Sequence, residues 1–320
     1  SIGFDYNGTE LFNNGASGVD EYLVFSPTQD SNREWTLYDV NNTDHNFSLT
    51  VLPARTLETV YSQDLNTGDN FGYDISINDW NETIVGAPGE STNKGAVYIF
   101  RRDISFQQLQ KQKIFPVLSF EESNRTKFGA ALDVSGADLI IGAPDSNDFK
   151  GKVYHYRRDD DNYTKINEIV DFNGSVNQQF GYNLTFGTDE NEIFVSSPHE
   201  KNAGVGKVIQ FSFNGSSWIQ KKQFWSSDDR NITGDSFGKD LAVDENFLVI
   251  GAPNAQIDET VSGLVYVFQR DEDGNWTEPA KVLAPQFFSD GDEFGHKVEI
   301  VDDIIFVASK NGDDGNRSDV

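Results

Sequence analysis

Short apolar segments separated by polar turns recur along the whole chain, and they predict β-strands. Residues 74–77 (Asp-Ile-Ser-Ile) and 240–243 (Asp-Leu-Ala-Val) alternate polar and apolar side chains, as half-buried strands do. The segments that follow them, such as residues 84–88 and 247–250, are continuously apolar, so we expect both faces of these strands to be covered. No segment has a helical period over a useful length, and the pattern therefore indicates an all-β protein.

Four sequence elements repeat in a fixed order. The dipeptide Phe-Gly begins at Phe71, Phe128, Phe180, Phe237 and Phe294, at spacings of 57, 52, 57 and 57 residues. A strand that starts with glycine forms the third element, at Gly95, Gly151, Gly206 and Gly263, and a looser strand such as residues 218–222 ends each unit. The second element lies between the Phe-Gly and the glycine of the third element. Its copies are Gly86-Ala87-Pro88, Gly142-Ala143-Pro144, Ser196-Ser197-Pro198, Gly251-Ala252-Pro253 and, decayed, Val307-Ala308-Ser309.

A unit of about 55 residues with four antiparallel strands, repeated head to tail, is typical of a β-propeller. A single four-stranded sheet cannot bury both of its faces, so each blade is expected to stack on its neighbours. Aromatic residues make up 13% of the chain, and they are expected to fill the space between blades.

The repeat predicts one propeller domain over residues 1–320. Residues 1–44 read as a decayed copy, because residues 21–27 align with 82–88 and residues 34–38 with 96–100. The last unit stops where a third strand would start, and residues 2–6 are candidates for a strand that closes the ring. Six units are countable, with seven blades if sequence is missing: 1–44, 45–103, 104–159, 160–214, 215–271 and the incomplete 272–320.

The Phe-Gly and Gly-Ala-Pro elements, in this order and spacing, resemble FG-GAP repeats, the units of the integrin alpha-subunit head and of related secreted propellers. The resemblance implies an extracellular adhesion or ligand-binding platform. The integrin-type repeat often carries a calcium loop between its first two strands, but the corresponding turns here are too short and too poor in oxygen ligands to surround Ca²⁺. We therefore predict no cofactor. Weak candidate metal ligands remain at Asp290, Asp292 and Glu293, whose acidic cluster also fits a solvated turn.

Composition excludes several classes of protein. The formal net charge is −27, from 25 Lys and Arg against 52 Asp and Glu, so the chain would repel nucleic-acid phosphates. It has no Cys, which excludes disulfides, thiol redox chemistry and cysteine-ligated zinc. No apolar run approaches the length of a membrane span. The acidic excess fits a soluble surface, and a surface for cations is the alternative.

Asn-x-Ser/Thr sequons are frequent, and together they favour a secreted or cell-surface glycoprotein with many exposed loops. This predicts an extracellular location reached through the secretory pathway. The twelve candidate glycosylation sites are Asn7, Asn41, Asn46, Asn81, Asn124, Asn162, Asn173, Asn183, Asn214, Asn231, Asn275 and Asn316.

No catalytic set emerges from the sequence. The four histidines, His45, His155, His199 and His296, occupy different places in their repeats, and none has metal-ligand spacing. Neither a nucleophile elbow nor a phosphate-binding loop is present. We expect a non-enzymatic protein, with a secreted hydrolase or its accessory domain as the lesser alternative.

The loops predict where such a protein binds. In a propeller the loops between strands two and three and those between consecutive units lie on one face, and here they vary over a constant scaffold. The leading hypothesis is therefore a binding or adhesion platform that contacts a protein or glycan ligand through this face. The alternative is a protomer of an extracellular filament, sheath or coat that self-assembles through its unfinished last unit.

Overall fold

A computed structural model describes residues 23–25, 35–39, 46–49, 60, 62–102, 108–117, 125–199, 206–226, 234–257, 259–285, 289–301 and 304–312. The chain divides into two compact units, Ser1–Thr59 and Val60–Val320. In the first unit, strands β1 (Leu23–Phe25), β2 (Trp35–Asp39) and β3 (Asn46–Leu49) form an antiparallel sheet in the order β1-β2-β3. β1 and β2 fall where the decayed copy predicts its second and third strands, and residues 2–6 lie outside the described residues.

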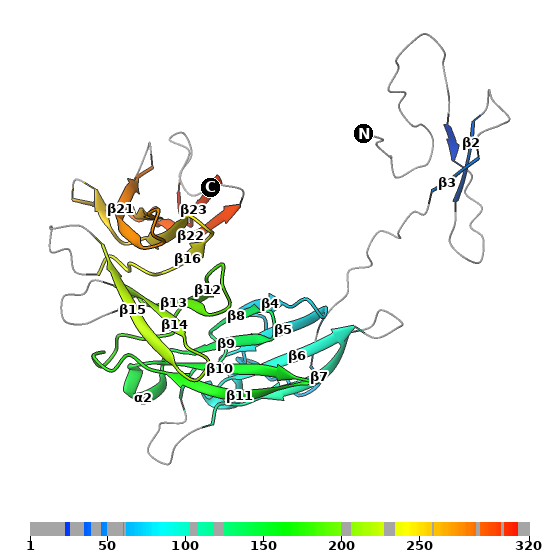
Figure 1. The fold of residues 1–320 in the computed structure, drawn as a ribbon, viewed down its shortest axis with the longest axis horizontal. Helices are drawn as coiled ribbons and strands as arrows, with labels where there is room; N and C mark the ends of the chain where they lie inside the picture. Colours follow the sequence, from blue (N-terminus) through cyan, green and yellow to red (C-terminus); the bar gives the residue numbers. More distant parts are fainter. Residues whose placement is uncertain are drawn as a thin grey trace, which may run out of the picture. The chain divides into compact units, whose positions relative to one another are not determined.

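The second unit is built from four-stranded antiparallel sheets, as the repeat predicts (Figure 1). We call them the first to fourth sheets in chain order, and the β22–β23 hairpin the fifth sheet. The first sheet comprises β4 (Ile75–Ile77), β5 (Glu82–Ala87), β6 (Ala96–Arg102) and β7 (Gln108–Ile114). The second comprises β8 (Ala131–Ser135), β9 (Asp138–Ala143), β10 (Lys152–Asp159) and β11 (Asn162–Ile169).

The remaining sheets follow the same order of strands. The third sheet comprises β12 (Leu184–Phe186), β13 (Glu192–Ser197), β14 (Lys207–Phe213) and β15 (Trp218–Trp225). The fourth comprises β16 (Leu241–Val243), β17 (Phe247–Ala252), β20 (Leu264–Arg270) and β21 (Trp276–Leu283), with the small hairpin β18 (Gln256–Ile257) and β19 (Thr260–Val261) between its middle strands. The fifth comprises β22 (Phe294–Val301) and β23 (Ile304–Ser309).

Each four-stranded sheet begins just after a Phe-Gly and ends at the looser fourth strand, so it is offset by one strand from the predicted units. For example, β15 pairs with β14 in the third sheet although the predicted boundary at residue 214 separates them. The loops between β5 and β6 and between β9 and β10 each contain a single helical turn, α1 (Glu90–Asn93) and α2 (Ser146–Phe149). No helix in the described part of the chain is long and apolar enough to cross a membrane.

The core lies between successive sheets, which explains the continuously apolar second strands. In β9, Leu139 and Ile141 pack against the first sheet, whereas Ile140 faces the third. In the four-stranded sheets, the Phe of each Phe-Gly meets an aromatic ring of the third strand in its own sheet, with centroids 5.2 Å apart for both Phe128–Tyr154 and Phe237–Tyr266. Apolar side chains that alternate between the two faces of a strand therefore fill both interfaces of every inner sheet, as expected for stacked blades.

Candidate functional site

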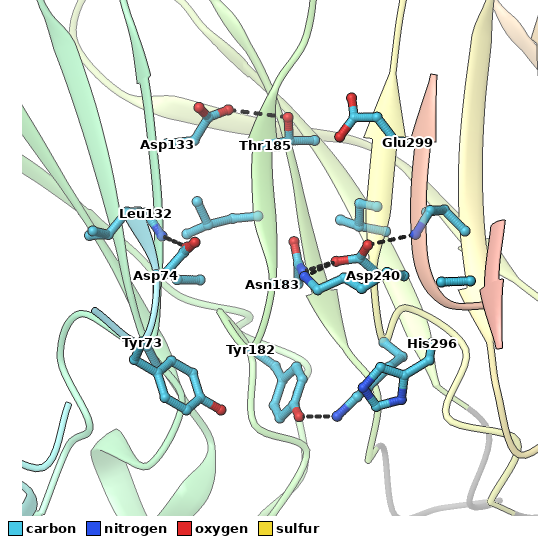
Figure 2. A pocket seen from close by; sticks show the side chains of 18 of the residues that line it. Tyr73, Asp74, Leu132, Asp133, Tyr182, Asn183, Thr185, Asp240, His296 and Glu299 are labelled. Carbon is cyan, nitrogen blue, oxygen red and sulfur yellow. Dashed lines mark hydrogen bonds and ion pairs between the residues drawn. The ribbon is translucent and has the colours of Figure 1, made fainter. Parts of the chain in front are cut away.

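Residues in or just before the first strands of the five sheets, with residues of β23, line a common cavity of about 670 Å³ (Figure 2). Three side-chain levels follow from the repeat. Residues two and three positions after each Phe of the Phe-Gly elements line this cavity, and so do the residues five positions after Phe128, Phe180 and Phe294. Figure 2 shows Tyr73, Tyr182 and His296 at one end. Asp74, Asn183 and Asp240 form the middle level, and Asp133, Thr185 and Glu299 form the far level.

The aspartates of this cavity tie neighbouring sheets together. Asp74 Oδ2 accepts the amide of Leu132 in the next sheet at 2.7 Å, and Asp133 Oδ2 accepts that of Phe186 at 2.7 Å. Asp240 Oδ2 accepts the amide of Val298 in the fifth sheet at 2.8 Å. A first strand is the inner edge of its sheet, so its amides lack a strand partner on that side. Each carboxylate therefore satisfies an edge amide of the following sheet.

One carboxylate of the cavity, that of Asp240, is paired with a lysine. Asp240 Oδ1 accepts Asn183 Nδ2 and Lys297 Nζ, both at 2.8 Å. Burial works to lower the pKa of Lys297, but the carboxylate of Asp240 outweighs it and the pKa is raised. Burial raises the pKa of both Asp74 and Asp133, although the amides that they accept oppose that shift. Burial and hydrogen bonding therefore act in opposite directions on the pKa of these two carboxyl groups.

A basic and aromatic group lies at the Tyr182 end of the cavity. Lys239 Nζ donates to the hydroxyl of Tyr182 and lies 4.7 Å from the centre of its ring. The ring of His199 contacts that of Tyr182, with centroids 5.8 Å apart. Burial, and to a lesser extent Lys239, lowers the pKa of His199. Both effects favour the neutral form of His199, which lies at the start of a loop between strands two and three.

The loops that the sequence assigns to one face are joined by backbone hydrogen bonds. The amides of Thr126 and Lys127 donate to the carbonyl of Asn93 in the α1 loop, at 2.9 and 3.0 Å. The same link recurs one sheet later, where the amide of Gln179 donates to the carbonyl of Phe149 at 2.9 Å. The described parts of these loops therefore form a connected rim, and each loop is held by the loop of the next sheet.

The opposite face carries buried polar links between sheets. Asn78 Nδ2 joins Glu82 Oε2 to the Tyr163 hydroxyl, with both contacts at 2.8 Å. Arg158 and Lys111 also pair with Glu82. Burial opposes the charged form of Glu82, but these partners outweigh it and lower the pKa of that carboxyl. Burial raises the pKa of Tyr163 to about 12.

The next sheet interface has the same kind of link, built on histidine. The indole N–H of Trp218 donates to His155 Nδ1 at 3.2 Å, which leaves Nε2 to carry the proton of a neutral ring. His155 Nε2 then donates to Asp138 Oδ1 at 2.7 Å. Burial opposes ionisation of Asp138, but His155 and Arg157 outweigh it and lower its pKa. The polar atoms of His155 are fully used between two sheets, so we assign it a structural role.

The three weak metal candidates make separate contacts. Asp290 Oδ1 accepts the amide of Val261 at 3.2 Å, and Asp292 Oδ2 accepts that of Ser289 at 2.6 Å. Glu293 Oε2 lies 2.8 Å from His296 Nδ1. Within the described ranges no three His, Cys, Asp or Glu side chains are grouped as metal ligands. The metal assignment stays a prediction.

The predicted sequons fall in different environments. Asn81, Asn214 and Asn275 in turns, and Asn162 at the start of β11, are exposed at the end of the sheets opposite the rim, and Asn173 is exposed in a rim loop. Asn46 begins β3. Asn183 lines the cavity, and its side-chain nitrogen, to which a glycan would be attached, donates to Asp240. Five more lie outside the described residues: Asn7, Asn41, Asn124, Asn231 and Asn316.

Comparison with known proteins agrees with this architecture. A family profile described as FG-GAP repeat matches residues 58–100 and 218–268. The chain is therefore an all-β, propeller-type protein of four-stranded sheets that carries FG-GAP repeats. No curated protein sequence is significantly similar to it.

Two solved bacterial structures are similar to the chain. One is a functionally unknown protein from Desulfotomaculum acetoxidans DSM 771, with a TM-score of 0.49 and 10% identity, covering 87% of this chain and 70% of that one. The other is a protein from Lactobacillus plantarum, with a TM-score of 0.44 and 11% identity, covering 84% of this chain and 65% of that one.

Proposed function

We propose that the protein is an extracellular, non-catalytic binding platform that contacts a protein or glycan ligand through its rim of loops. The observation that carries this proposal is an exposed apolar group on the rim. Phe172 is 93% exposed, and Val176, four residues later in the same loop, is 46% exposed. Phe149 of α2 is 38% exposed, and its carbonyl accepts the amide of Gln179 from that loop.

Exposed aromatic side chains on a fixed backbone are well suited to recognition. A phenylalanine in water gives up the free energy that its burial would contribute, about 1.5–3 kcal/mol. Clusters of this kind on folded proteins mark interaction sites, and aromatic anchors supply much of the binding energy in interfaces. The loop does not need to be ordered anew on binding, since the Phe149–Gln179 hydrogen bond and the buried Lys207–Asp171 ion pair already hold it.

The chemistry of the cavity favours binding over catalysis. Asp74, Asp133 and Asp240 each accept an amide from the next sheet, which is a structural use of a carboxylate. A glycosidase needs one carboxyl group as an acid and a second as base or nucleophile, both directed at the substrate. The exposed sequons support an extracellular setting, because such turns are accessible to the glycosylation machinery.

The test is a screen of the secreted protein against arrays of glycans, matrix proteins and cell-surface proteins, followed by affinity measurement of each hit. We expect Phe172→Ala and Phe149→Ala to weaken binding at least about tenfold, as anchor residues do. Ile166→Ala is the matched control, because Ile166 is similarly exposed, at 44%, but lies on strand β11 away from the rim. Equal affinity of Phe172→Ala and wild type for every ligand found would reject the assignment of this face.

Glycosylation at Asn173 bears directly on the same test, because this sequon adjoins Phe172. We expect Asn173→Gln to bind at least as tightly as wild type, since a glycan at that position would cover the phenylalanine. Binding that depends on the Asn173 glycan would instead place recognition on the sugar and contradict the role of Phe172.

A second candidate function, assembly with other copies, is favoured by the exposed apolar faces of the terminal sheets. Ile75 and Ile77 of β4 are exposed, and so are Val301, Ile304 and Phe306 of the fifth sheet. Large exposed apolar patches favour association. Light scattering during size-exclusion chromatography should then show mass increasing with concentration, and Phe306→Asp should abolish the increase. A monomer at every concentration contradicts assembly.

A further inference from the structure

A second cavity, of about 600 Å³, lies between the third and fourth sheets at the end opposite the rim. Its lining includes Glu192, Gln210, Lys222, Arg270 and Trp276. Exposed residues line it as well, among them Asp189 and Asn275 in neighbouring turns and Lys221 in β15, so it opens to solvent. The cavity is separate from the one formed by the first strands and has no part in the proposed function.

Its position is equivalent to the polar links at the two preceding interfaces. There, a carboxylate that begins a second strand is joined through one bridging side chain to an aromatic polar group of the next sheet. Asn78 bridges Glu82 to Tyr163, and His155 bridges Asp138 to Trp218. At the third interface the corresponding carboxylate and aromatic group are Glu192 and Trp276.

The third link is incomplete. Gln210 occupies the position of His155 and donates to Glu192 Oε1 at 2.6 Å, but it makes no hydrogen bond with Trp276. Trp276 is only 4% exposed, and its indole nitrogen has no hydrogen-bond partner among the described residues. A buried donor without a partner costs about 1–3 kcal/mol, which favours an occupant that accepts a hydrogen bond.

Arg270 supplies a second donor at the same place. Its guanidinium carbon lies 4.5 Å from the centre of the Trp276 ring, and one terminal nitrogen pairs with Glu192 Oε2. Its Nε is buried and also without a partner in the described part of the chain. Two side chains that stack on each other and line the same cavity therefore each carry a buried N–H group without an acceptor among the described residues.

The charge of the lining selects the kind of acceptor. Arg270 and Gln210 satisfy Glu192, and Asp189 Oδ1 accepts the backbone and side-chain nitrogens of Asn191, both at 2.9 Å. Lys221 and Lys222 add positive charge at the cavity, and Lys222 Nζ donates to the carbonyls of Trp276 and Thr277. Groups that only accept hydrogen bonds and carry negative charge fit this lining best.

We propose that this cavity is a binding site for an oxyanion, a carboxylate or sulfate group on a small ligand, with Arg270 Nε and Trp276 Nε1 as its hydrogen-bond donors. The ligand completes the third interface as Asn78 and His155 complete the other two. In a chain of net charge −27, an anion that binds here does so against the overall field, so binding depends on these specific donors.

The test follows the five tryptophan indole N–H signals by two-dimensional ¹H–¹⁵N NMR, using protein produced without glycans. Trp276→Phe identifies the Trp276 signal and removes the donor while it keeps a ring beneath Arg270. Sodium sulfate and sodium glucuronate are titrated against sodium chloride at matched ionic strength. We expect a saturable shift of the Trp276 signal with a dissociation constant of about 1 mM or tighter, and no comparable shift in chloride.

Two variants separate the site from general effects of salt. Trp218→Phe is the matched control, because the Trp218 N–H already donates to His155, and this variant should bind as wild type does. Arg270→Lys retains the charge but loses the Nε donor, and it should weaken binding about tenfold or more. If Trp276→Phe does not fold, the Trp276 signal is assigned by through-bond NMR experiments on the wild type, and the wild-type titration and Arg270→Lys complete the test.

The two anions distinguish the source of the group, since a response to sulfate alone indicates a sulfated ligand and a response to glucuronate alone indicates a carboxylate. A Trp276 signal that ignores both anions, or that moves equally in chloride, overturns the proposal and leaves a water molecule as the occupant. Wild-type affinity in Arg270→Lys would likewise overturn it. Repeating the titration with protein glycosylated at Asn275 shows whether a glycan at the cavity entrance blocks the site.

Discussion

The backbone of Phe128 lies directly against Gly95 of the preceding sheet. The two residues form a parallel β-bridge, and a β-carbon added to Gly95 would lie 2.2 Å from the Phe128 oxygen and 2.5 Å from its nitrogen. The same approach recurs between Gly151 and Phe180. The glycine before each third strand and the Phe-Gly of the next unit are thus the two sides of one contact between sheets.

We expect a substitution at Gly95 to reduce stability by more than its left-handed backbone conformation alone accounts for, because the close contact between sheets is also disturbed. Gly95 and Gly215 have similar positive φ values, +86° and +90°, but a β-carbon at Gly215 would meet nothing within 4 Å. Gly215→Ala should therefore cost only about 1–2 kcal/mol of stability from the left-handed backbone. Gly95→Ala should cost about 1–3 kcal/mol more, because the sheets must move apart. Denaturant unfolding of both variants measures the difference, and equal losses would contradict a close contact at Gly95.

The amide acceptors of the first cavity are expected to stabilise the sheet stack. Asp133→Ala leaves the amide of Phe186 without its acceptor and should reduce the free energy of unfolding by about 1–3 kcal/mol. Hydrogen exchange of the Phe186 amide should accelerate in the same variant. Asp79→Ala, at an exposed turn, is the control and should change stability by less than about 0.5 kcal/mol. Unchanged exchange at Phe186 would show that Asp133 is not its acceptor in solution.

Acid should weaken the interface between the second and third sheets through Asp138. His155 and Arg157 lower its pKa, so the folded state prefers the charged carboxylate. Its contribution is therefore complete above the unfolded-state pKa, near 3.9, and is lost as pH falls through the lower folded-state pKa. The raised pKa values of Asp74 and Asp133 act in the opposite direction, but they are shared by wild type and variant.

The comparison of wild type with Asp138→Asn isolates the contribution of the Asp138 carboxylate to the free energy of unfolding. The difference in unfolding free energy between them should be largest at neutral pH and should shrink by about 1 kcal/mol or more towards pH 2. Urea unfolding between pH 2 and pH 7 measures it. A difference that stays constant with pH would mean that Asp138 is not ionised preferentially in the folded state.

Sequon occupancy should follow the environment of each asparagine. The side-chain nitrogen of Asn183 is engaged by Asp240 within the first cavity, so we expect this site to stay unmodified in a eukaryotic secretory host. Asn214 and Asn275 are exposed in turns and Asn162 is exposed at the start of β11, so all three should be accessible. Glycopeptide mass spectrometry before and after deglycosylation measures both. A glycan on most copies of Asn183 would contradict the Asn183–Asp240 contact.

Much of the fold could be predicted from the sequence because the repeat carries it. The period fixed by Phe71, Phe128, Phe180, Phe237 and Phe294 predicts successive four-stranded sheets, and the FG-GAP match agrees with it. The continuously apolar second strands predict burial on two faces, which Ile140 and its neighbours confirm. The sheet boundaries were harder to place, since a repeat has the same period wherever it is divided.

The candidate sites depended on distances that a repeat pattern does not contain. Phe172 in the sequence is one of 25 phenylalanines, and only the folded chain separates it from the buried rings of the core. Asp133 is likewise one of 52 Asp and Glu residues in the sequence, and only the folded chain shows that it accepts the amide of Phe186 from the next sheet.

The sequence by itself determined the strand period, the turns and the order of the sheets, because these depend on residues close together in the chain. Tertiary structure alone decided which polar groups meet across an interface. Trp218 and Trp276 occupy equivalent strands, yet one indole N–H finds His155 and the other finds no partner among the described residues. That difference depends on side chains from two sheets more than 50 residues apart, so only packing could reveal it.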